Sequence, residues 1–385
     1  MTNSQLENIE SVQNALQDWA LNHAFTLWHR IGVDPTNGAF YEKVGQTETP
    51  QNLPRRARVT PRQIYCFCMA GKLGWDGPWR DIVKAGTTYF FNNFFRVDGF
   101  VRSLIGADGS ILDDEAVLYD QAFALFALAN IQSVMPEFDD PESRAKALLV
   151  ALRQQQSSPL GGFKEFSTKA LPLLSNPHMH LLEATLEWAK ISKDPIWQQQ
   201  ANEIAELCLK KFIDPEIGCV REYFDGEWAP QEGIDGQKFE PGHQYEWGWL
   251  LLRWGQSINR PDAIEAALKM IGLAEEVGID HSRGVAYNVM LKDLSIYDLK
   301  SRLWPQTERI KACLLAAELT RDYQYLQSVI EGAKGLNKYL ATPIKGLWYD
   351  TMTPSGELIA EDAPASSFYH VICSIVELDN FVRRL

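Results

Sequence analysis

A short glycine signal recurs six times along the 385-residue chain and constrains its architecture more than any other feature. Each copy combines one or two glycines, an apolar or aromatic neighbour, a brief alternating stretch and a turn. The copies are NGAFYE, DGFVRS, GGFKEF, GCVREY, RGVAYN and GLWYDT, which begin at Asn37, Asp98, Gly161, Gly218, Arg283 and Gly346. Their spacing is about 60 residues, and a period of this kind indicates one supersecondary unit repeated within a single fold. We therefore expect residues 1–385 to form a single domain.

Between the glycine signals, the apolar residues recur with helical periodicity. Pro141 and Pro261 suit the first position of a helix, where the missing backbone N–H costs nothing. Short stretches after the glycines, closed by turns such as ADGS and PSGE, predict β-hairpins. The periodicity predicts twelve helices, two per repeat, at about 6–31, 61–73, 79–95, 114–134, 141–156, 177–192, 196–212, 242–257, 261–277, 302–319, 322–340 and 364–383.

Six helical pairs predict an all-α fold, an (α/α)6 barrel of six helical hairpins with short β-hairpins in the loops. An open solenoid is the alternative, but such a stack needs polar capping repeats. Both terminal helical segments are instead rich in aromatic and aliphatic residues. In a closed barrel, the starts of alternate helices would face one cavity at one mouth.

Composition argues against several partners and compartments. The net charge of −13 disfavours nucleic acid, because phosphate binding needs a basic face. No apolar run reaches the length of a membrane span, and MTNSQLENIE has neither the basic nor the apolar region of a secretory signal. The six cysteines show no CxxC pair and no disulfide framework. We expect a cytoplasmic protein with no nucleic-acid or membrane partner.

Two sequence blocks carry a histidine and a glutamate three residues apart at an expected helix start. In NPHMHLLEA, His180 and Glu183 share a helix face, while His178 points elsewhere. In PGHQYEWGWLL, His243 and Glu246 repeat this spacing in a first helical turn. Because a helix N-terminus disfavours a protonated imidazole, we expect His243 to be neutral, as a general base must be.

A third block, SSFYHVICSIVEL, has His370 in the first turn or so of the last helix. Histidines therefore occur at helix starts in repeats three, four and six. Comparable positions offer further side chains that we expect to line one polar pocket: Arg58, Arg62, Tyr119, Asp120, Gln121, Trp304, Gln306 and Glu308. Neutral histidines with carboxylate partners suit proton transfer at a carbon next to a carbonyl, with arginine polarising the oxygen. Tryptophans would supply a surface on which sugar rings stack.

At these residues the chain resembles the N-acylglucosamine 2-epimerase superfamily. The matching pieces are RQIYCF, LYDQAFAL, the N-x-x-M-H-x-x-E-A pattern from Asn176 to Ala184, PGHxxEWxWLL, WPQTE and the late histidine in SSFYH. The resemblance implies an (α/α)6 barrel that isomerises or epimerises sugars without a metal or another cofactor. The blocks around His180 and His243 are most similar to the mannose isomerase group, and His178 also resembles the NxHLHxLE pattern of cellobiose 2-epimerases.

The resemblance also implies roles for the matching residues. His243 and His370 would be the catalytic acid and base, acting at C1 and C2 through a cis-enediol. His180 would assist ring opening or hold the sugar. The substrate-binding residues would be Arg62, Tyr119, Asn176, His180, Glu183, Glu246, Trp304 and Glu308, with Arg58 and Gln306 as additional candidates.

The favoured function is a cofactor-independent isomerase that interconverts an aldose and a ketose, with D-mannose and D-fructose as the preferred pair. A sugar 2-epimerase of the N-acylglucosamine or cellobiose type is the main alternative, because the sequence does not decide whether the enediolate is reprotonated at C1 or C2. An inverting glycosidase could use Glu246 with Glu308 or Asp120, but it leaves the histidines unexplained. A non-enzymatic binding protein is a further alternative.

The expected ligand is a monosaccharide, or alternatively a disaccharide, and the sequence leaves open whether it is phosphorylated. We expect no metal ion, because helical spacing gives only separated His/Glu pairs. The sequence is compatible with a monomer or a homodimer.

Overall fold

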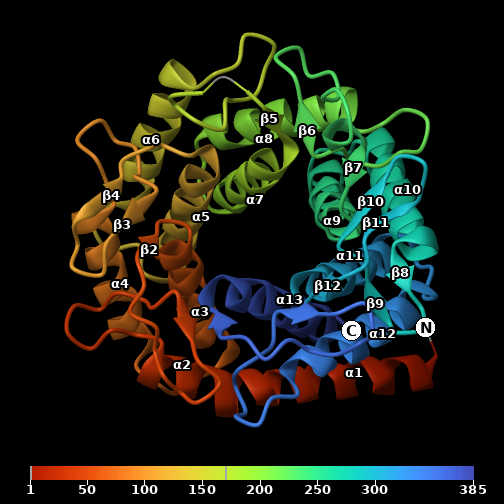
Figure 1. Cartoon of the computed structure of the whole chain (residues 1–385), viewed down its shortest axis with the longest axis horizontal. Helices are drawn as coiled ribbons and strands as arrows, with labels where there is room; N and C mark the ends of the chain where they lie inside the picture. The colour runs from red at the N-terminus through yellow and green to blue at the C-terminus, as the bar shows by residue number, and fades with distance from the viewer. Residues whose placement is uncertain (1, 170) are drawn as a thin grey trace.

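The computed structural model describes residues 2–169 and 171–385, which form a closed ring of helical pairs (Figure 1). Each inner helix packs against the next, and the last packs against the first, so the ring has no open end. Within the described ranges there are six inner helices: α3 (Val59–Leu73), α5 (Leu118–Val134), α7 (Ser175–Ile191), α9 (Pro241–Ser257), α11 (Trp304–Thr320) and α13 (Ala365–Arg383). The predicted (α/α)6 barrel with short hairpins is confirmed.

A second layer of helices covers the outside of this ring (Figure 1). Most outer helices pack against the inner helix that precedes them in the chain. They are α4 (Trp79–Asn93), α6 (Pro141–Gln155), α8 (Pro195–Leu207), α10 (Pro261–Val277) and α12 (Tyr325–Leu340). The N-terminal helix completes the layer as α1 (Asn3–Asp18), a π-helical segment (Trp19–Ala24) and α2 (Phe25–Ile31), with α1 packed on α12 and α13.

Local sequence explains where several helices begin and end. Pro141 and Pro261 occupy the first turn of α6 and α10, as predicted. The side chain of Asp194 accepts the N–H of Ile196 and so caps α8. The predicted helix over 196–212 differs from the structure in its last turn, since Cys208–Phe212 is π-helical and the apolar pattern does not distinguish the two forms.

Short strands link neighbouring repeats around one end of the ring. A strand just before an inner helix pairs with the hairpin that follows the next outer helix. The antiparallel pairs of this kind are β2 (Arg55–Arg56) with β3 (Leu104–Ile105), β5 (Leu173–Leu174) with β6 (Tyr223–Phe224), β7 (Lys238–Phe239) with β10 (Val289–Leu291), and β12 (Ser301–Arg302) with β13 (Thr351–Met352). The same rule joins β1 (Lys43–Val44) to β14 (Ala363–Pro364), which seals the first repeat to the last.

The remaining strands extend these hairpins. They are β4 (Ile111–Asp113), β8 (Ile279–Asp280), β9 (Val285–Ala286) and β11 (Ile296–Asp298). Most signal glycines lie in turns before the hairpin strands, between residues that form isolated antiparallel bridges such as Ile213 with Val220. Gly218, for example, has φ 80°, a conformation that glycine adopts without steric cost.

A side chain from the first turn of an inner helix fixes the hairpin in four repeats. The residue two positions after the signal glycine donates its backbone N–H to that side chain, over 2.7–3.2 Å. The donor and acceptor residues are Val101 and Gln121, Phe163 and His178, Val220 and Gln244, and Ala286 and Gln306. The amide groups of Gln121 and Gln244 also donate to the carbonyl of the same residue, as a neighbouring strand would.

The residue four positions after the signal glycine lies over the start of the preceding inner helix. Its carbonyl accepts a backbone N–H at or just before that helix start, over 2.8–3.2 Å. The acceptors and donors are Ser103 and Ala57, Glu165 and Leu118, Glu222 and Ser175, Asp350 and Leu303, and Glu42 and Ala365. These bonds satisfy N–H groups that a helix leaves free, and they bring a polar residue of each hairpin to the mouth of the barrel.

The apolar core lies between the two layers of helices. Trp188 stacks on Trp197 between α7 and α8, with ring centroids 4.8 Å apart. Trp28 stacks on Trp348 at the same distance, between α2 and the sixth hairpin. The six cysteines are buried and unpaired in the described residues. Among these residues, no helix has the length and apolar character needed to cross a membrane.

Removing the amide group of Gln121 tests the fixing of a hairpin by an inner helix. In Gln121→Ala, the buried N–H of Val101 loses its acceptor, so the free energy of unfolding should fall by about 1–3 kcal/mol. Urea denaturation followed by circular dichroism measures the change. Gln154→Ala, at an exposed position of α6, is the control and should cost less than about 0.5 kcal/mol. Equal losses in the two variants would contradict the structural role of Gln121.

Candidate active site

The starts of the inner helices converge on a polar cavity of about 140 Å³ at one mouth of the barrel. Most of its lining side chains are charged or carry hydrogen-bonding groups, so it suits a small ligand with many polar groups. Residues more than 300 positions apart in the sequence meet there. The structure brings these predicted residues together in the cavity wall: Arg62, Tyr119, Asn176, His180, His243, Glu246, Trp304 and His370.

His243 lies in the first turn of α9, against a carboxylate that the sequence analysis did not single out. Its Nδ1 is 2.9 Å from Oε2 of Glu222 and 3.9 Å from the carboxylate of Glu240. Burial lowers the pKa of this imidazole, but the nearby carboxylates, Glu222 foremost, outweigh burial and raise the pKa to about 10. His243 is therefore protonated at neutral pH. The prediction of a neutral His243 is wrong, because the charge of Glu222 exceeds the effect of the helix N-terminus.

His370 has the opposite electrostatic environment, although it lies on the same cavity. Its Nδ1 is 2.8 Å from Oε1 of Glu308. Burial lowers the pKa of His370 well below its usual value, and the cations Arg62 and Lys311 lower it further. His370 is neutral at pH 7. With Nδ1–H donated to Glu308, the lone pair is on Nε2, the ring atom left for a ligand.

The indole of Trp304 contacts both of these histidines. The ring centroids of Trp304 and His243 are 5.0 Å apart, and those of Trp304 and His370 are 5.6 Å apart. Gly242 permits this position, since a Cβ on that residue would lie 2.4 Å from the indole. One aromatic side chain thus fixes the separation of a protonated and a neutral imidazole.

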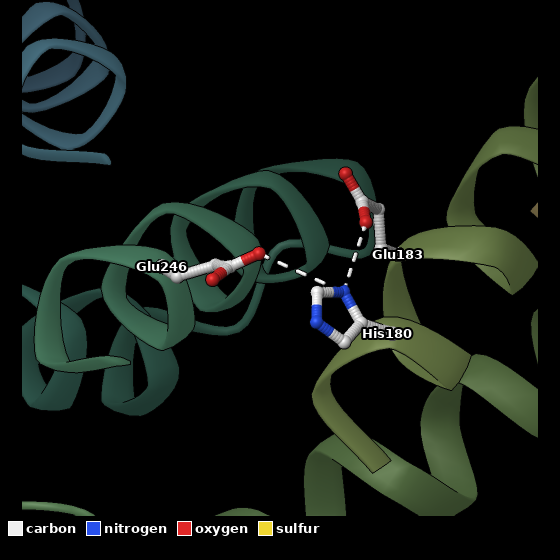
Figure 2. Close-up of side chains that lie close together, drawn as sticks. All are labelled: His180, Glu183 and Glu246. Atoms are coloured by element: carbon white, nitrogen blue, oxygen red, sulfur yellow. Dashed lines mark hydrogen bonds and ion pairs between the residues drawn. The ribbon is translucent and has the colours of Figure 1, made fainter. Parts of the chain in front are cut away.

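His180 on α7 lies between two carboxyl groups, as Figure 2 shows. Its Nδ1 is 3.4 Å from Oε2 of Glu183 on the same helix and 3.7 Å from Oε1 of Glu246 on α9. Burial lowers the pKa of His180 to about 4 in spite of Glu183. Burial, together with the charge of Glu308, raises the pKa of Glu246 well above its usual value. His180 is therefore neutral at pH 7.

The expectation of separated His/Glu pairs does not hold, because three groups of potential metal ligands converge. In each group the ligand atoms lie within 4.8 Å of one another. The groups are His180, Glu183 and Glu246; Glu222, Glu240 and His243; and Glu246, Glu308 and His370. A metal ion fits these groups poorly, because the buried cations Arg62 and Lys311 already lie among the first and third, and the charged His243 belongs to the second.

Two of the predicted substrate-binding residues lie behind the cavity wall. Glu183 accepts the hydroxyl of Tyr369 and faces Nδ1 of His180. Glu308 is fully buried between His370 and Lys311. Both carboxylates hold the histidines that line the cavity instead of lining it themselves.

Two further candidates serve the scaffold. Gln306 accepts the N–H of Ala286 and donates to the carbonyl of Arg302, and it does not line the cavity. Arg58 is paired with the buried Asp120, with Nε 2.8 Å from Oδ1. These contacts explain why both residues occur at helix starts without belonging to the cavity wall.

Arg62 is held in the cavity wall by aromatic side chains. Its Nη2 is 2.5 Å from the hydroxyl of Tyr119, and its guanidinium lies 4.0 Å from the ring centroid of Phe123. Stacking on an aromatic ring fixes the plane of the guanidinium and therefore the direction of its remaining N–H groups. Arg62 therefore presents a fixed cation to the cavity.

Several residues of the site were not predicted from the sequence: Glu222, Glu240, Arg302, Ser366 and Ser367. A signal for Glu222 exists in the repeat itself. The position four residues after the signal glycine is acidic in four repeats, as Glu42, Glu165, Glu222 and Asp350. Aligning the repeats on their glycines would have marked these carboxylates as a set at the mouth.

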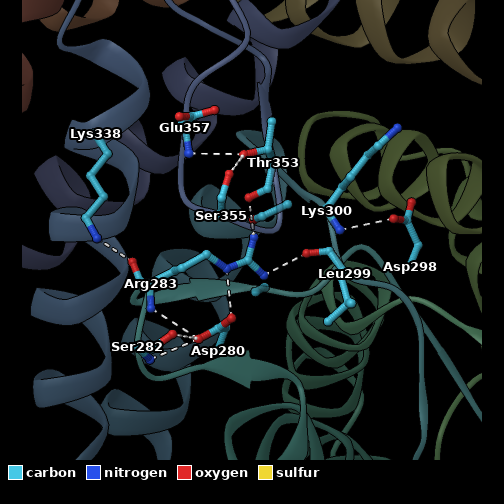
Figure 3. Close-up of polar contacts among 12 residues, drawn as sticks. Asp280, Ser282, Arg283, Asp298, Leu299, Lys300, Lys338, Thr353, Ser355 and Glu357 are labelled. Atoms are coloured by element: carbon cyan, nitrogen blue, oxygen red, sulfur yellow. Dashed lines mark hydrogen bonds and ion pairs between the residues drawn. The ribbon is translucent and has the colours of Figure 1, made fainter.

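Arg283 holds the loop that leads into α11, as Figure 3 shows. Its Nε is 2.7 Å from Oδ2 of Asp280, and its Nη2 is 2.7 Å from the carbonyl of Leu299. Its Nη1 is 2.9 Å from the carbonyl of Thr353 in the next hairpin. A single guanidinium therefore joins two glycine hairpins to the segment before Arg302, which lines the cavity.

Solved structures with the same fold place the chain among (α/α)6-barrel proteins. A cellobiose 2-epimerase from Spirochaeta thermophila DSM 6192 superposes with a TM-score of 0.89 and 19% identity, covering 100% of this chain and 99% of that one. A D-mannose isomerase superposes with a TM-score of 0.86 and 18% identity, covering 96% and 97% of the two chains.

Sequence comparison identifies the family. The family model of N-acylglucosamine 2-epimerase matches residues 38–374. A mannose-6-phosphate isomerase from Rhizobium meliloti (strain 1021) is 40% identical over 376 residues, covering 96% of this chain and 97% of that protein. The chain belongs to the N-acylglucosamine 2-epimerase family, as its motifs predicted, and it is an enzyme of the isomerase class.

Replacing Glu222 tests the charge state of His243. In Glu222→Gln the main carboxylate that raises the pKa is lost, so the pKa of His243 should fall from about 10 toward or below 6.5. NMR titration of the imidazole measures the shift, and Glu227→Gln, at an exposed position, should leave it unchanged. Because the folded-state pKa is the higher one, this pairing stabilises the fold fully below about pH 6.5 and is lost as the pH rises through 10. An unchanged pKa in Glu222→Gln would contradict the assignment.

Proposed function

We propose that this enzyme interconverts an aldose and a ketose, D-mannose and D-fructose, by moving one proton between C2 and C1. The observation that carries the proposal is the pair of histidines in contact with Trp304, one protonated and one neutral at pH 7. A neutral imidazole removes a proton from carbon, and an imidazolium protonates the carbonyl oxygen in the same step. His370 is the base and His243 is the acid.

The reaction follows from these two charge states. Nε2 of His370 takes the proton from C2 of the open-chain aldose while His243 gives a proton to O1, which yields a cis-enediol. The now neutral His243 then takes the proton from O2 as His370 returns its proton to C1. The product is the ketose, both histidines regain their starting states, and no proton is gained or lost overall.

The other cavity residues bind and orient the sugar. Trp304 offers an aromatic face to the sugar, and Arg62 supplies a positive charge for the developing enediolate. Tyr119, Asn176 and Glu246 offer donors and acceptors to hydroxyl groups. His180, which is neutral, holds the sugar or assists opening of its ring.

A phosphorylated substrate is a second candidate, because a relative with 40% identity is named mannose-6-phosphate isomerase. The charges of the cavity favour the free sugar. Arg302 is already paired with Asp350 at 3.3 Å, and Glu240 lines the same cavity, where a carboxylate would oppose a phosphate. We therefore expect D-mannose to react with a higher kcat/KM than D-mannose 6-phosphate.

A sugar 2-epimerase remains the alternative within the family, which takes its name from that reaction. The two reactions share the first proton transfer and differ in the carbon that is reprotonated. Incubation with mannose in heavy water separates them by NMR. An isomerase yields fructose, with deuterium at C1 only in turnovers in which the proton on His370 exchanges with solvent, whereas an epimerase yields the C2-epimeric aldose with deuterium at C2. Neither product nor exchange, over a panel of free and phosphorylated hexoses, would exclude both.

Replacing either catalytic histidine should abolish most of the turnover. We expect His370→Ala and His243→Ala each to lower kcat by about 10²–10⁴-fold, the usual contribution of a general acid or base. His281→Ala, at an exposed turn, is the matched control and should keep the activity. A loss below about tenfold in His370→Ala would remove this histidine from the reaction. Release of reducing sugar from an oligosaccharide would indicate a glycosidase instead.

Metal removal gives an independent test of the chemistry. We expect dialysis against EDTA to change kcat/KM by less than about twofold, because the acid and the base are both side chains. A loss of activity that Zn²⁺ or Mn²⁺ restores would instead assign a metal ion to one of the His/Glu groups. Thermal denaturation of the treated protein checks that the fold is unchanged.

A further inference from the structure

A lysine is buried completely behind the cavity, which is an unusual place for an ammonium group. Lys311 on α11 has no exposed surface. Its Nζ is 2.6 Å from Oε2 of Glu308 and 4.1 Å from the ring centroid of Trp249. Burying a charge costs free energy, and a buried ion pair often adds no net stability. A role in the site explains the position of Lys311 better than a contribution to stability.

Lys311 compensates a group of acids that come from three neighbouring inner helices. Glu183, Glu246 and Glu308 are each at most 1% exposed, and all three act on the charge of Lys311. The other polar and titratable groups near this cluster are His180, His243, His370, Arg62, Tyr369 and Cys373. Without the lysine, several carboxylates would repel one another in a region without solvent.

Glu308 is the acid to which Lys311 lies in direct contact, and it is also the partner of His370. One carboxylate oxygen, Oε2, faces the ammonium, and the other, Oε1, is 2.8 Å from Nδ1 of His370. Lys311, Glu308 and His370 therefore form one line from the interior to the cavity. A carboxylate in an ion pair with a lysine only accepts hydrogen bonds, so its contact with Nδ1 requires a proton on that nitrogen of the histidine.

We propose that Lys311 is a positioning residue that sets the tautomer of His370 through its ion pair with Glu308. With Nδ1 protonated, the lone pair of His370 is on Nε2, on the side of the cavity. If Glu308 were to carry a proton, it would donate to Nδ1, and the proton of the neutral ring would move to Nε2. The ring would then keep its position but could no longer act as a base. The catalytic consequence rests on the function proposed above, whereas the tautomer does not.

The tautomer is measured directly by nitrogen NMR of the protein labelled with ¹⁵N-histidine. His370→Gln assigns the signals of His370. We expect the wild-type protein to have the proton on Nδ1 and Lys311→Met to have it on Nε2. An Nδ1 proton in both proteins would overturn the proposal, whatever the enzyme's substrate is. If no sugar reacts, the proposed function fails, but this measurement still shows whether Lys311 sets the tautomer of His370.

Steady-state kinetics separate positioning from simple structural support. We expect Lys311→Met to lower kcat by about 10²-fold or more, with KM changed by less than about threefold, since the base is lost but the cavity wall is kept. Arg309→Met is the matched control: Arg309 lies on the same helix, is 1% exposed and is 2.6 Å from Glu275, away from the cavity. That variant should lose stability and keep both kcat and the tautomer. An equal loss of kcat in the two variants would overturn the proposal.

A double variant covers the case in which Lys311→Met is too unstable to study. Because Lys311 acts only through the charge of Glu308, Glu308→Gln and the pair Glu308→Gln with Lys311→Met should have kcat values within about threefold of each other. Removing both charges also avoids leaving one of them buried alone. A further loss of tenfold or more on adding Lys311→Met would mean that the lysine acts by another route, and would overturn the proposal.

Discussion

In five repeats a backbone bond joins the glycine hairpin to the start of the preceding inner helix, and the closed ring depends on these bonds. The carbonyl four residues after the glycine accepts an N–H that the helix cannot satisfy itself. Glu222 illustrates the result, since its backbone holds α7 and its carboxylate holds His243 on α9. Closure of the ring and assembly of the site are therefore one event, not two.

Charge is distributed in the cavity by burial and by the choice of partner. His243 and His370 are both buried and both contact a carboxylate, yet one is charged and the other is neutral. The difference comes from what surrounds each pair: further carboxylates near His243, and Arg62 with Lys311 near His370. Two histidines of one cavity thus take different charge states because different residues lie behind them.

The fold was predictable because its repeat, helical periodicity and turn residues all indicate the same architecture. The cavity was predictable in part, since helix starts in a closed ring must converge, and most residues chosen on that ground, such as Arg62 and His370, line it. The predictions that failed are those that depend on contacts with a residue of a neighbouring hairpin. His243 looked neutral because Glu222 is 21 residues away in sequence, and Gln306 looked like a ligand because its partner Ala286 lies in another element. Side-chain contacts between repeats decide which residues line the cavity and which support it. Helical periodicity gives no information about these contacts.

The pairing of β1 with β14 has a consequence for the order of events during synthesis. It joins residues 43–44 to 363–364, and His370, which lines the cavity, follows only a few residues later. Contacts so distant in sequence form late, because the chain between them must be ordered before they repay the cost of closing the loop. A chain made only as far as α11 therefore lacks the helix that closes the ring, and the buried acids around Lys311 lack one wall of their surroundings. The cavity is complete only once α13 has been made and packed, because this helix carries His370 and also closes the ring against α3.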